Sequence, residues 1–316
     1  MTSASVLPTI EIDRHIVGEN IWLCDRNAEA QAELMSRGPQ VLRYEVLDSE
    51  AAVGQAMFDE LVSAADATRD DLTIVILGGR GGQALHRLIG EKAQTNEIDS
   101  LLARMNVFTQ DALAPMRQDN AFSFVRDFER LLGDSFFRKV KSFTSMQTDA
   151  DDLESGLIAF LGELESRGPI DILFLGMGPE AGGASHLAYI KPGSGAAAND
   201  LAGLIPISSD ILGHHINKFK VGGAQTNDAD EAECRSASHI LTLGPAAILR
   251  ARRIVQSIVD AATAPGKVAS FVRLVNTEIS VDAVERARQL DENPGLWIRL
   301  HSNVRSLILP DVLKTS

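Results

Sequence analysis

The sequence predicts an α/β protein with a doubly wound, mainly parallel, Rossmann-like sheet and helices on both of its faces. Two runs carry the prediction, Leu72–Leu77 (LTIVIL) and Ile170–Leu175 (IDILFL), because short apolar runs between turn residues are typical of fully buried strands. Each run enters a glycine-rich segment, and the succession of strand, loop and helix recurs at least four times along the chain. This rhythm indicates a single α/β domain.

The N-terminal part, residues 1–47, is predicted to be an extension packed on a core domain of residues 48–316. Its predicted elements are the strands Ile10–Ile16 and Asn20–Cys24, the helix Asn27–Arg37 and the strand Val41–Val46. This part carries no residue pattern typical of a catalytic site, so we expect the function to lie in the core domain.

The core domain begins with an amphipathic helix, Ser49–Ala65, whose first turn is acidic and which Asp48 or Ser49 caps. Further predicted helices are Gln83–Ala93, Ile98–Met105, Ala121–Leu132 (closed by Gly133), Asp151–Ser166, Ile211–Phe219, Ala246–Arg253, Val268–Val275 and Asp282–Leu290. Further predicted strands are Asn106–Gln110, Leu201–Ser209 (strand, then loop), His239–Leu243 and Ile254–Ala261, and two further segments, Trp297–His301 and Arg305–Leu309, end the chain. The most polar connector, Thr226–Ser238, is predicted to be a solvated loop.

Composition and charge exclude several classes of function. Of the 316 residues, 45% are apolar, and the net charge of −13 argues against a general nucleic-acid or acidic-membrane surface, which needs clustered Lys and Arg. One small phosphorylated substrate needs only a local positive pocket, so this ligand class stays open. The sequence shows neither a signal peptide nor an apolar run of membrane-spanning length. Cys24 and Cys234 lie far apart without metal-ligand neighbours, so we expect a reduced, cytoplasmic protein.

A glycine-rich segment, Gly78 to Gly82 (GGRGG), connects the first long strand to a helix. Such a turn is a common phosphate cradle, because its N–H groups and the positive helix N-terminus face an anion. The segment is neither a Walker loop, which ends in Gly-Lys-Ser/Thr, nor the GxGxxG dinucleotide fingerprint. A tight connection without a ligand is the alternative that the segment alone leaves open.

Acidic and imidazole side chains follow two of the predicted strands. Asp111 comes directly after one of them, and Glu180 and His186 lie in the loop after another. Ligands of open α/β sheets bind at the carboxyl ends of strands, and a carboxylate with an imidazole is a common pair for proton transfer. Gly176 and Gly178 let this loop bring its main chain close to a ligand. We therefore predict that it is the catalytic loop.

The order of these segments resembles the glucosamine-6-phosphate deaminase/isomerase and 6-phosphogluconolactonase superfamily, whose fold is a modified Rossmann-like sheet shared with ribose-5-phosphate isomerase. The resemblance runs from about Ser49 to Leu309. Leu77-Gly78-Gly79-Arg80 resembles the family's phosphate loop, with Arg80 in place of the hydroxyl residue as a charged phosphate clamp. Phe108-Thr109-Gln110-Asp111-Ala112 is similar to the deaminase motif F-N-M-D-E and keeps its aspartate but not its glutamate. The resemblance implies that Asp111 is the base that moves a proton between sugar C1 and C2.

The second glycine-rich loop is similar to the family in two registers. Gly176-Met177-Gly178-Pro179-Glu180 follows the lactonase spelling G-M-G-P-D, and a straight continuation places Gly182 where the lactonase histidine belongs. A loop four residues longer instead aligns His186–Pro192 (HLAYIKP) with the deaminase segment H-I-A-F-N-E-P. In that register His186 is the catalytic imidazole, and Lys191 replaces the glutamate that orients it. The sequence leaves both registers open.

The resemblance also implies two phosphate-binding lysines. Asp210–Phe219 resembles the deaminase segment that carries a phosphate-binding arginine, and Lys218 or Asn217 falls near that position. Pro265-Gly266-Lys267 resembles the family's G-x-x-K helix start, and it brings the ammonium group of Lys267 beside free N–H groups.

The leading expectation is therefore a cofactor-independent isomerase or deaminase of a hexose or hexosamine 6-phosphate. Asp111 would move the proton between C1 and C2, while Glu180 and His186 would protonate the ring oxygen or activate water. A 6-phosphogluconolactonase-like hydrolase and a non-catalytic sugar-phosphate sensor are the alternatives. The adjacent His214 and His215 point apart on a helix and have no carboxylates at ligand spacing, so no metal site is predicted. A sugar phosphate is the expected partner, nucleic acid and membrane are not, and a homo-oligomer stays open.

Overall fold

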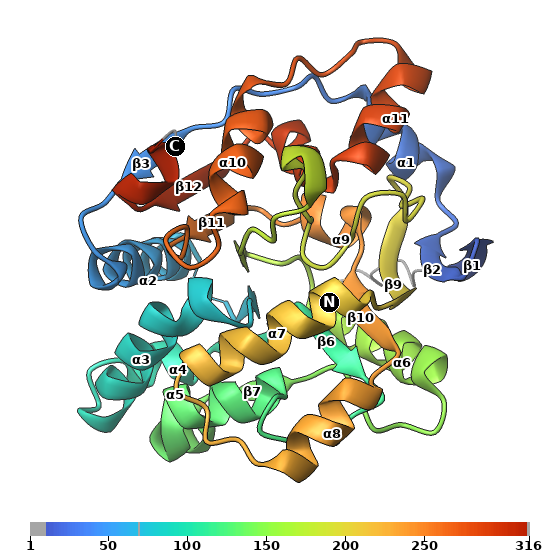
Figure 1. Cartoon of the computed structure of the whole chain (residues 1–316). Helices are drawn as coiled ribbons and strands as arrows, with labels where there is room; N and C mark the ends of the chain where they lie inside the picture. The colour runs from blue at the N-terminus through green and yellow to red at the C-terminus, as the bar shows by residue number, and fades with distance from the viewer. Residues whose placement is uncertain (1–10, 69, 315–316) are drawn as a thin grey trace, which may run out of the picture.

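Seven parallel strands form the central sheet of the computed structural model (Figure 1), which describes residues 11–68 and 70–314. Their order across the sheet is β3-β12-β11-β8-β4-β5-β7, and all six neighbouring pairs are parallel. The strands are β3 (Tyr44–Val46), β4 (Leu72–Ile76), β5 (Met105–Thr109), β7 (Ser142–Thr144), β8 (Ile172–Leu175), β11 (Ile254–Ile258) and β12 (Val304–Ile308). The predicted parallel α/β fold is confirmed.

Helices cover both faces of this sheet, and each face has its own hydrophobic core. Neighbouring residues of β4 alternate between the two cores, with Ile74 and Ile76 in one and Val75 in the other, as the two-residue period of a strand requires. The first core packs under α2 (Glu50–Asp66), α3 (Arg80–Gln94), α4 (Asp99–Leu102) and α5 (Phe124–Lys139). The second packs under α1 (Ala28–Ser36), α6 (Leu153–Ser166), α9 (Pro245–Leu249), α10 (Gly266–Asn276) and α11 (Ala283–Glu292).

A second, antiparallel sheet of five strands lies beside the second core, in the order β1-β2-β9-β10-β6. Its strands are β1 (Ile12–Val17), β2 (Asn20–Asp25), β6 (Asp111–Ala114), β9 (Asp200–Pro206) and β10 (His239–Leu243). The sequence pattern does not reveal this sheet, because β6, β9 and β10 are buried along almost their whole length. A strand buried on both sides has the same apolar pattern whether its neighbours are parallel or antiparallel.

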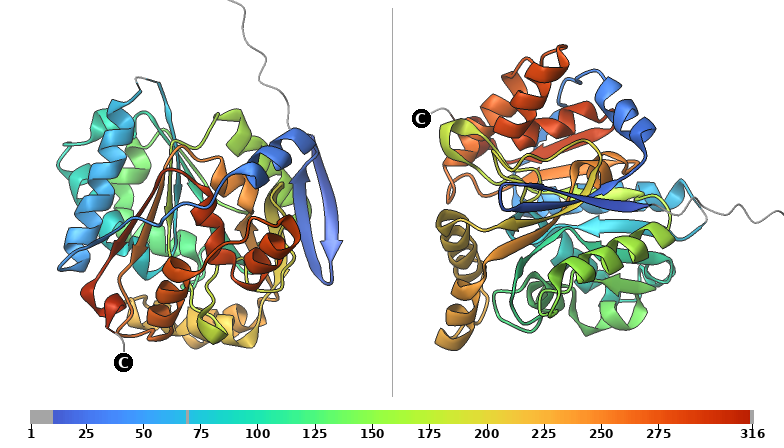
Figure 2. Two further views of the ribbon diagram at one scale, coloured as in Figure 1. Left: turned by 90° about the horizontal axis from the view of Figure 1, so that it is seen from above. Right: turned by 90° about the vertical axis from the view of Figure 1, so that its right-hand side faces the viewer.

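The described part of the predicted N-terminal extension, residues 11–47, supplies strands to both sheets. The β1–β2 hairpin pairs with β9 and stands at one side of the molecule (Figure 2), whereas β3 pairs with β12 at the edge of the parallel sheet. Trp22 of β2 is fully buried, and its Nε1 donates a hydrogen bond to the carbonyl oxygen of Ser194 at 3.0 Å. Residues 1–10 of the predicted extension lie outside the described residues.

The prediction of a solvated loop at Thr226–Ser238 is wrong, because α8 (Asp228–Ser236) occupies most of this segment. The side chain of Asn227 caps the helix by accepting a hydrogen bond from the main-chain N–H of Asp230 at 2.9 Å. Acidic residues fill its first turn, where the helix dipole favours them, and the buried Cys234 anchors it. The polar composition that suggested a loop is the solvated face of a short helix.

One predicted helix end lies at a kink. Gly133, which was predicted to close a helix, adopts a non-helical conformation with a φ of 70°, and α5 continues beyond this kink to Lys139. The segment expected near Trp297 is part of a 3₁₀ helix, η2 (Pro294–Leu300), and two shorter ones are η1 (Ala181–Gly183) and η3 (Pro310–Leu313). Within 11–68 and 70–314, no helix is long and apolar enough to span a membrane.

The connectivity of the parallel sheet changes direction between β4 and β8. The chain passes from β4 to β5 and β7 on one side, and from β8 to β11 and β12 on the other. Loops that leave two neighbouring strands in opposite directions open a crevice at their carboxyl ends, which is where doubly wound sheets bind ligands. Helix α7 (Ser209–Val221) follows β9 and contributes the side chains that face this crevice.

Candidate active site

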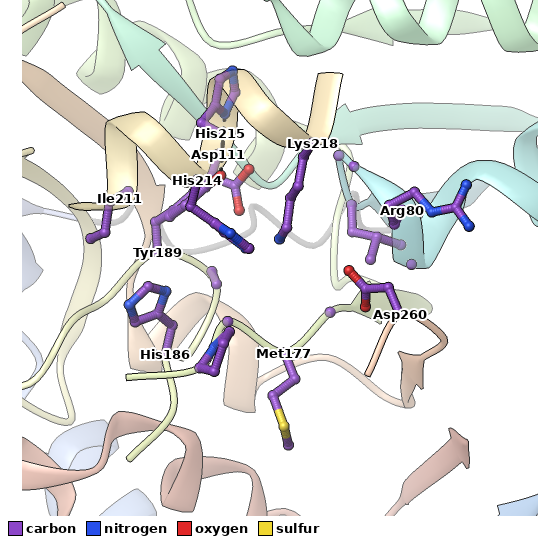
Figure 3. A pocket seen from close by; sticks show the side chains of 18 of the residues that line it. Arg80, Asp111, Met177, His186, Tyr189, Ile211, His214, His215, Lys218 and Asp260 are labelled. Atoms are coloured by element: carbon purple, nitrogen blue, oxygen red, sulfur yellow. Dashed lines mark hydrogen bonds between the residues drawn. The ribbon is translucent and has the colours of Figure 1, made fainter. Parts of the chain in front are cut away.

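A cavity of about 380 Å³ opens at the carboxyl ends of β4, β5, β8 and β11, opposite α7 (Figure 3). The structure brings all ten side chains or glycines predicted from the sequence to this cavity. They are Gly78, Gly79, Arg80, Asp111, Gly176, Gly178, Glu180, His186, Lys218 and Lys267. Residues up to 189 positions apart in the sequence therefore meet at the topological switch point of the sheet.

The loop after β4 forms one wall and leads directly into α3. Gly79 has a φ of 76°, which favours glycine, and a Cβ at Gly78 would lie 2.2 Å from Cδ1 of Phe124. Among residues 11–68 and 70–314, no side chain caps the N-terminus of α3, so no side chain occupies its first N–H groups beside the cavity. The guanidinium of Arg80, in contrast, pairs with Glu50 of α2 and points away from the cavity in Figure 3. In this conformation the loop offers an anion its main chain and not the predicted guanidinium clamp.

Asp111 is the first residue of β6 and lies at the bottom of the cavity, with 6% of its surface exposed. Burial raises the pKa of its carboxyl group to about 7, although the positive charge of Lys218 acts in the opposite direction. The preceding residue, Gln110, is buried and donates a hydrogen bond from Nε2 to the carbonyl oxygen of Phe174 in β8 at 3.1 Å. This bond connects the end of β5 to β8, two strands away in the sheet, and fixes the main chain that precedes Asp111.

Two lysines reach the cavity from different helices. Lys218 of α7 has no hydrogen-bond or ion-pair partner for its Nζ within the described part of the chain, and burial lowers its pKa to about 8. Lys267, in the first turn of α10, forms a buried ion pair with Asp260 of the loop after β11. Burial raises the pKa of Asp260, but the charges of Lys267 and Lys218 outweigh it and hold the pKa below its usual value.

The loop after β8 carries a carboxylate–imidazole pair. Nε2 of His186 lies 2.5 Å from Oε1 of Glu180, and this hydrogen bond lowers the pKa of Glu180. The main-chain N–H of His186 donates to the carbonyl oxygen of Gly178 at 2.8 Å, and a Cβ at Gly178 would lie 2.4 Å from Nδ1 of the ring. Glycine at this position therefore allows the imidazole to lie against the loop.

The geometry of this loop bears on the two registers that the sequence left open. His186 lines the cavity, whereas Gly182 belongs to η1 with a φ of 67° and is not among the residues that line it. Nζ of Lys191 donates to the carbonyl oxygen of Pro206 at 2.7 Å, so this lysine does not contact the imidazole. Glu180 orients the ring instead, from six residues before it.

Four further titratable residues line the cavity that the sequence did not identify as site residues: Tyr189, His214, His215 and Asp260. Nε2 of His215 lies 2.8 Å from the carbonyl oxygen of Phe122 and must donate to it, so Nδ1 accepts from the hydroxyl of Tyr189 at 3.3 Å. The ring of His214 lies in the cavity in Figure 3, and its buried Nε2 has no hydrogen-bond partner among the described residues. Burial lowers the pKa of both histidines to about 4, so both are neutral at pH 7.

The sequence contains a signal for only one of these four residues. Asp260 directly follows the run Ile254–Val259, as Asp111 directly follows the run Asn106–Gln110. The adjacent histidines 214 and 215 suggest only a metal site from their sequence, and their two rings diverge in the structure (Figure 3). Across residues 11–68 and 70–314, no three His, Cys, Asp or Glu side chains are arranged to hold a metal ion.

The fold is shared with solved structures of a glucosamine-6-phosphate deaminase and of 6-phosphogluconolactonases. The chain superposes on a monomeric glucosamine-6-phosphate deaminase with a TM-score of 0.66 and 18% identity, over 86% of this chain and 98% of that chain. It also superposes on 6-phosphogluconolactonases from Shewanella baltica (TM-score 0.59, 17% identity, 85% and 97% covered) and Trypanosoma cruzi (TM-score 0.59, 16% identity, 88% and 97% covered). The resemblance predicted from the sequence is thus confirmed in the fold.

At these identities the likeness establishes the fold alone. No protein-family model matches the sequence, and no curated protein matches it either.

Proposed function

We propose that the chain is a sugar-phosphate isomerase or deaminase that acts on a hexose or hexosamine 6-phosphate. The observation that carries the proposal is Asp111, a carboxylate buried in the cavity whose pKa of about 7 suits a general base at neutral pH. Solved structures with the same fold include a glucosamine-6-phosphate deaminase, and its substrate class fits a cavity of about 380 Å³.

In this proposal the phosphate group binds at the N-terminus of α3 and beside the ammonium groups of Lys218 and Lys267. This contact fixes the sugar so that C1 and C2 lie over Asp111. The carboxylate removes the proton from C2, an enediol or enolamine forms, and the carboxylic acid returns the proton to C1. Glu180 and His186 form the remaining proton-transfer pair and act at the ring oxygen.

A specific observation also favours a second candidate, a 6-phosphogluconolactonase-like hydrolase. Glu180 accepts the hydrogen bond from Nε2 of His186, so the other ring nitrogen is the acceptor that takes a proton from water. Gly176-Met177-Gly178-Pro179 matches the lactonase spelling, and two solved lactonases share the fold. This reaction would use the imidazole as its base and would not need the Asp111 carboxylate for C–H chemistry.

Proton NMR in D2O distinguishes the candidates. The purified protein is incubated in turn with glucosamine 6-phosphate, fructose 6-phosphate and 6-phosphogluconolactone. Solvent deuterium at C1 or C2, lost in Asp111→Asn and kept in the control Asp171→Asn, supports the isomerase or deaminase. Asp171 is a comparable buried carboxylate that pairs with Arg252 outside the cavity.

Accelerated lactone opening without exchange assigns the hydrolase instead. If neither reaction occurs but a sugar phosphate raises the melting temperature, the protein is a non-catalytic sensor and the proposed chemistry is wrong.

A further inference from the structure

A buried ion pair, and not a lone cation, lies where the cavity would receive a phosphate group. Asp260 follows β11 and Lys267 lies in the first turn of α10, and a hydrogen bond joins Nζ of the lysine to Oδ1 of the aspartate. The two side chains are only 3% and 4% exposed, and both line the same cavity as the glycine loop after β4.

The groups around Asp260 are cations and a neutral imidazole. Lys267 contacts it from α10, while Lys218 and His214 face it from α7. Lys218 has no hydrogen-bond partner for its Nζ in the residues described, so its charge acts on Asp260 and Asp111 through space. The carboxylate of Asp260 is therefore the counter-ion of both lysines.

A carboxylate in this position competes with the anionic group of any ligand. An ammonium group has three N–H donors, and Asp260 uses one of those of Lys267. A phosphate dianion brought to the same place meets the like charge of the carboxylate in a site with little water, where charges interact strongly. The net effect of Asp260 on phosphate affinity is therefore expected to be unfavourable.

We propose that Asp260 is an internal counter-anion that competes with the ligand's phosphate for Lys267 and Lys218 and thereby limits the affinity of the cavity for phosphate. The inference rests on the proposed function, in which this end of the cavity binds phosphate. It also deepens that function, because the ligand must then be a phosphate ester whose sugar part supplies much of the binding energy. Free inorganic phosphate then binds weakly. The carboxylate prevents phosphate binding energy from stabilising only the ground-state complex, which would lower KM without raising kcat.

Calorimetric titration at pH 7 with inorganic phosphate, and separately with glucose 6-phosphate, tests the proposal. The proteins are the wild type, Asp260→Asn and the control Asp171→Asn, whose carboxylate is also buried and paired but lies outside the cavity. Asp260→Asn is expected to bind inorganic phosphate at least about tenfold more tightly than the wild type, and the control is expected to bind it equally well. Unchanged or weaker binding by Asp260→Asn overturns the proposal, because the carboxylate then only positions Lys267.

Asp260→Asn leaves the buried ammonium group of Lys267 without its carboxylate partner, so the melting temperature of each protein is measured as well. Phosphate supplies the missing anion and is therefore expected to raise the melting temperature of Asp260→Asn more than that of the wild type. If the variant unfolds in dilute buffer, refolding in phosphate is the readout, and failure of phosphate to restore the fold contradicts the proposal.

These results separate the inference from the proposed function. Deuterium exchange by the wild type, together with no gain of affinity in Asp260→Asn, rejects only the role of Asp260. No binding of phosphate or glucose 6-phosphate by any of the three proteins rejects the phosphate site itself, and the inference with it.

Discussion

Oε1 of Glu180 lies 2.5 Å from Nε2 of His186, and the hydrogen bond lowers the pKa of the carboxyl group. Because the ionised carboxylate can only accept, Nε2 carries the proton and Nδ1 is the free acceptor. The ring is thus held in one tautomer, as a base for proton transfer requires. Glu180 therefore determines which nitrogen of His186 is available to accept a proton.

Replacing Glu180 by Gln removes this control, because an amide can either donate to or accept from the ring. We expect Glu180→Gln to lower kcat about 100-fold in whichever reaction the wild type catalyses. The measurement is steady-state turnover, with Glu163→Gln as the control, since Glu163 pairs with Arg167 on the surface of α6. Equal turnover in both variants would show that the pair is structural.

The same hydrogen bond makes stability depend on pH. The pKa of Glu180 is lowered in the folded protein from an ordinary value of 4.5, so its contribution to stability is fully present above that value. It is lost as the pH falls through the lower, folded pKa. The difference in unfolding free energy between the wild type and Glu180→Gln should therefore be larger at pH 7 than at pH 3.5, as measured by urea denaturation.

Asp111 should show the opposite dependence, because its pKa is raised from 3.8 to about 7 in the folded protein. As a base it must be ionised, so kcat/KM should fall as the pH drops through about 7. Ionisation of Asp111 also lowers the free energy of unfolding. The loss begins as the pH rises above the pKa of the unfolded chain, and it is complete above the pKa of the folded protein. Asp111→Asn should thus gain stability relative to the wild type between pH 4 and pH 8, by about 4 kcal/mol at most.

Urea denaturation at pH 4 and pH 8 measures the difference in unfolding free energy between Asp111→Asn and the wild type. The pH dependence of kcat/KM of the wild type tests whether Asp111 is the base. A profile that stays flat between pH 5.5 and pH 8 would remove Asp111 from the proton-transfer step.

Gly178 tests the packing beneath His186. A Cβ at this position would lie 2.4 Å from Nδ1, so Gly178→Ala should displace the ring from Glu180. We expect turnover to fall by at least about tenfold and stability by about 1–3 kcal/mol. In the control Gly162→Ala, on helix α6, the new methyl group meets no atom of the described residues within 4 Å and should add about 0.5–1 kcal/mol of stability without changing turnover. Normal activity of Gly178→Ala would mean that the ring position is unimportant.

The sequence predicts the parallel sheet and most of the site for one physical reason. Buried strands of an open α/β sheet are short apolar runs, and the residue directly after each run lies at the ligand-binding edge. Asp111 and the glycines at 78 and 176 stand in such positions, and all three line the cavity. Asp260 stands in one too, but the predicted strand Ile254–Ala261 includes it, whereas β11 ends at Ile258.

The remaining features depend on contacts between distant segments, which no local pattern contains. The antiparallel sheet joins β2 to β9, although about 180 residues separate them. The guanidinium of Arg80 pairs with Glu50 of α2, 30 residues earlier in the chain, so its direction could not be inferred from the glycine loop. His186 and Glu180 are neighbours because η1 bends the chain between them.

The pair between Arg80 and Glu50 leads to a direct test of the predicted guanidinium clamp. Because the guanidinium contacts Glu50 and not the cavity, Arg80→Gln should change the Kd for glucose 6-phosphate by less than about twofold. It should cost only about 0–1 kcal/mol of stability, the usual range for a partly exposed ion pair. A large loss of affinity in calorimetry would mean that the guanidinium turns to the phosphate when the ligand binds.

Lys218 is expected to behave differently from Arg80, because its ammonium group lies in the cavity without a partner among the residues described. Lys218→Met removes a charge-assisted contact to phosphate and should raise the Kd for glucose 6-phosphate about 10- to 100-fold. It also removes the positive charge that lowers the pKa of Asp111, so the acid limb of the pH–rate profile should move to higher pH.

The control is Lys220→Met on the same helix, since Lys220 pairs with Glu231 of α8 at 2.5 Å, outside the cavity. If Lys218 only stabilised the helix, Lys218→Met would change neither the Kd for glucose 6-phosphate nor the acid limb. If Lys218 only bound phosphate, the substitution would change the Kd but not the acid limb. A shift of both in Lys218→Met, and of neither in Lys220→Met, would place the ammonium group between the phosphate and the base.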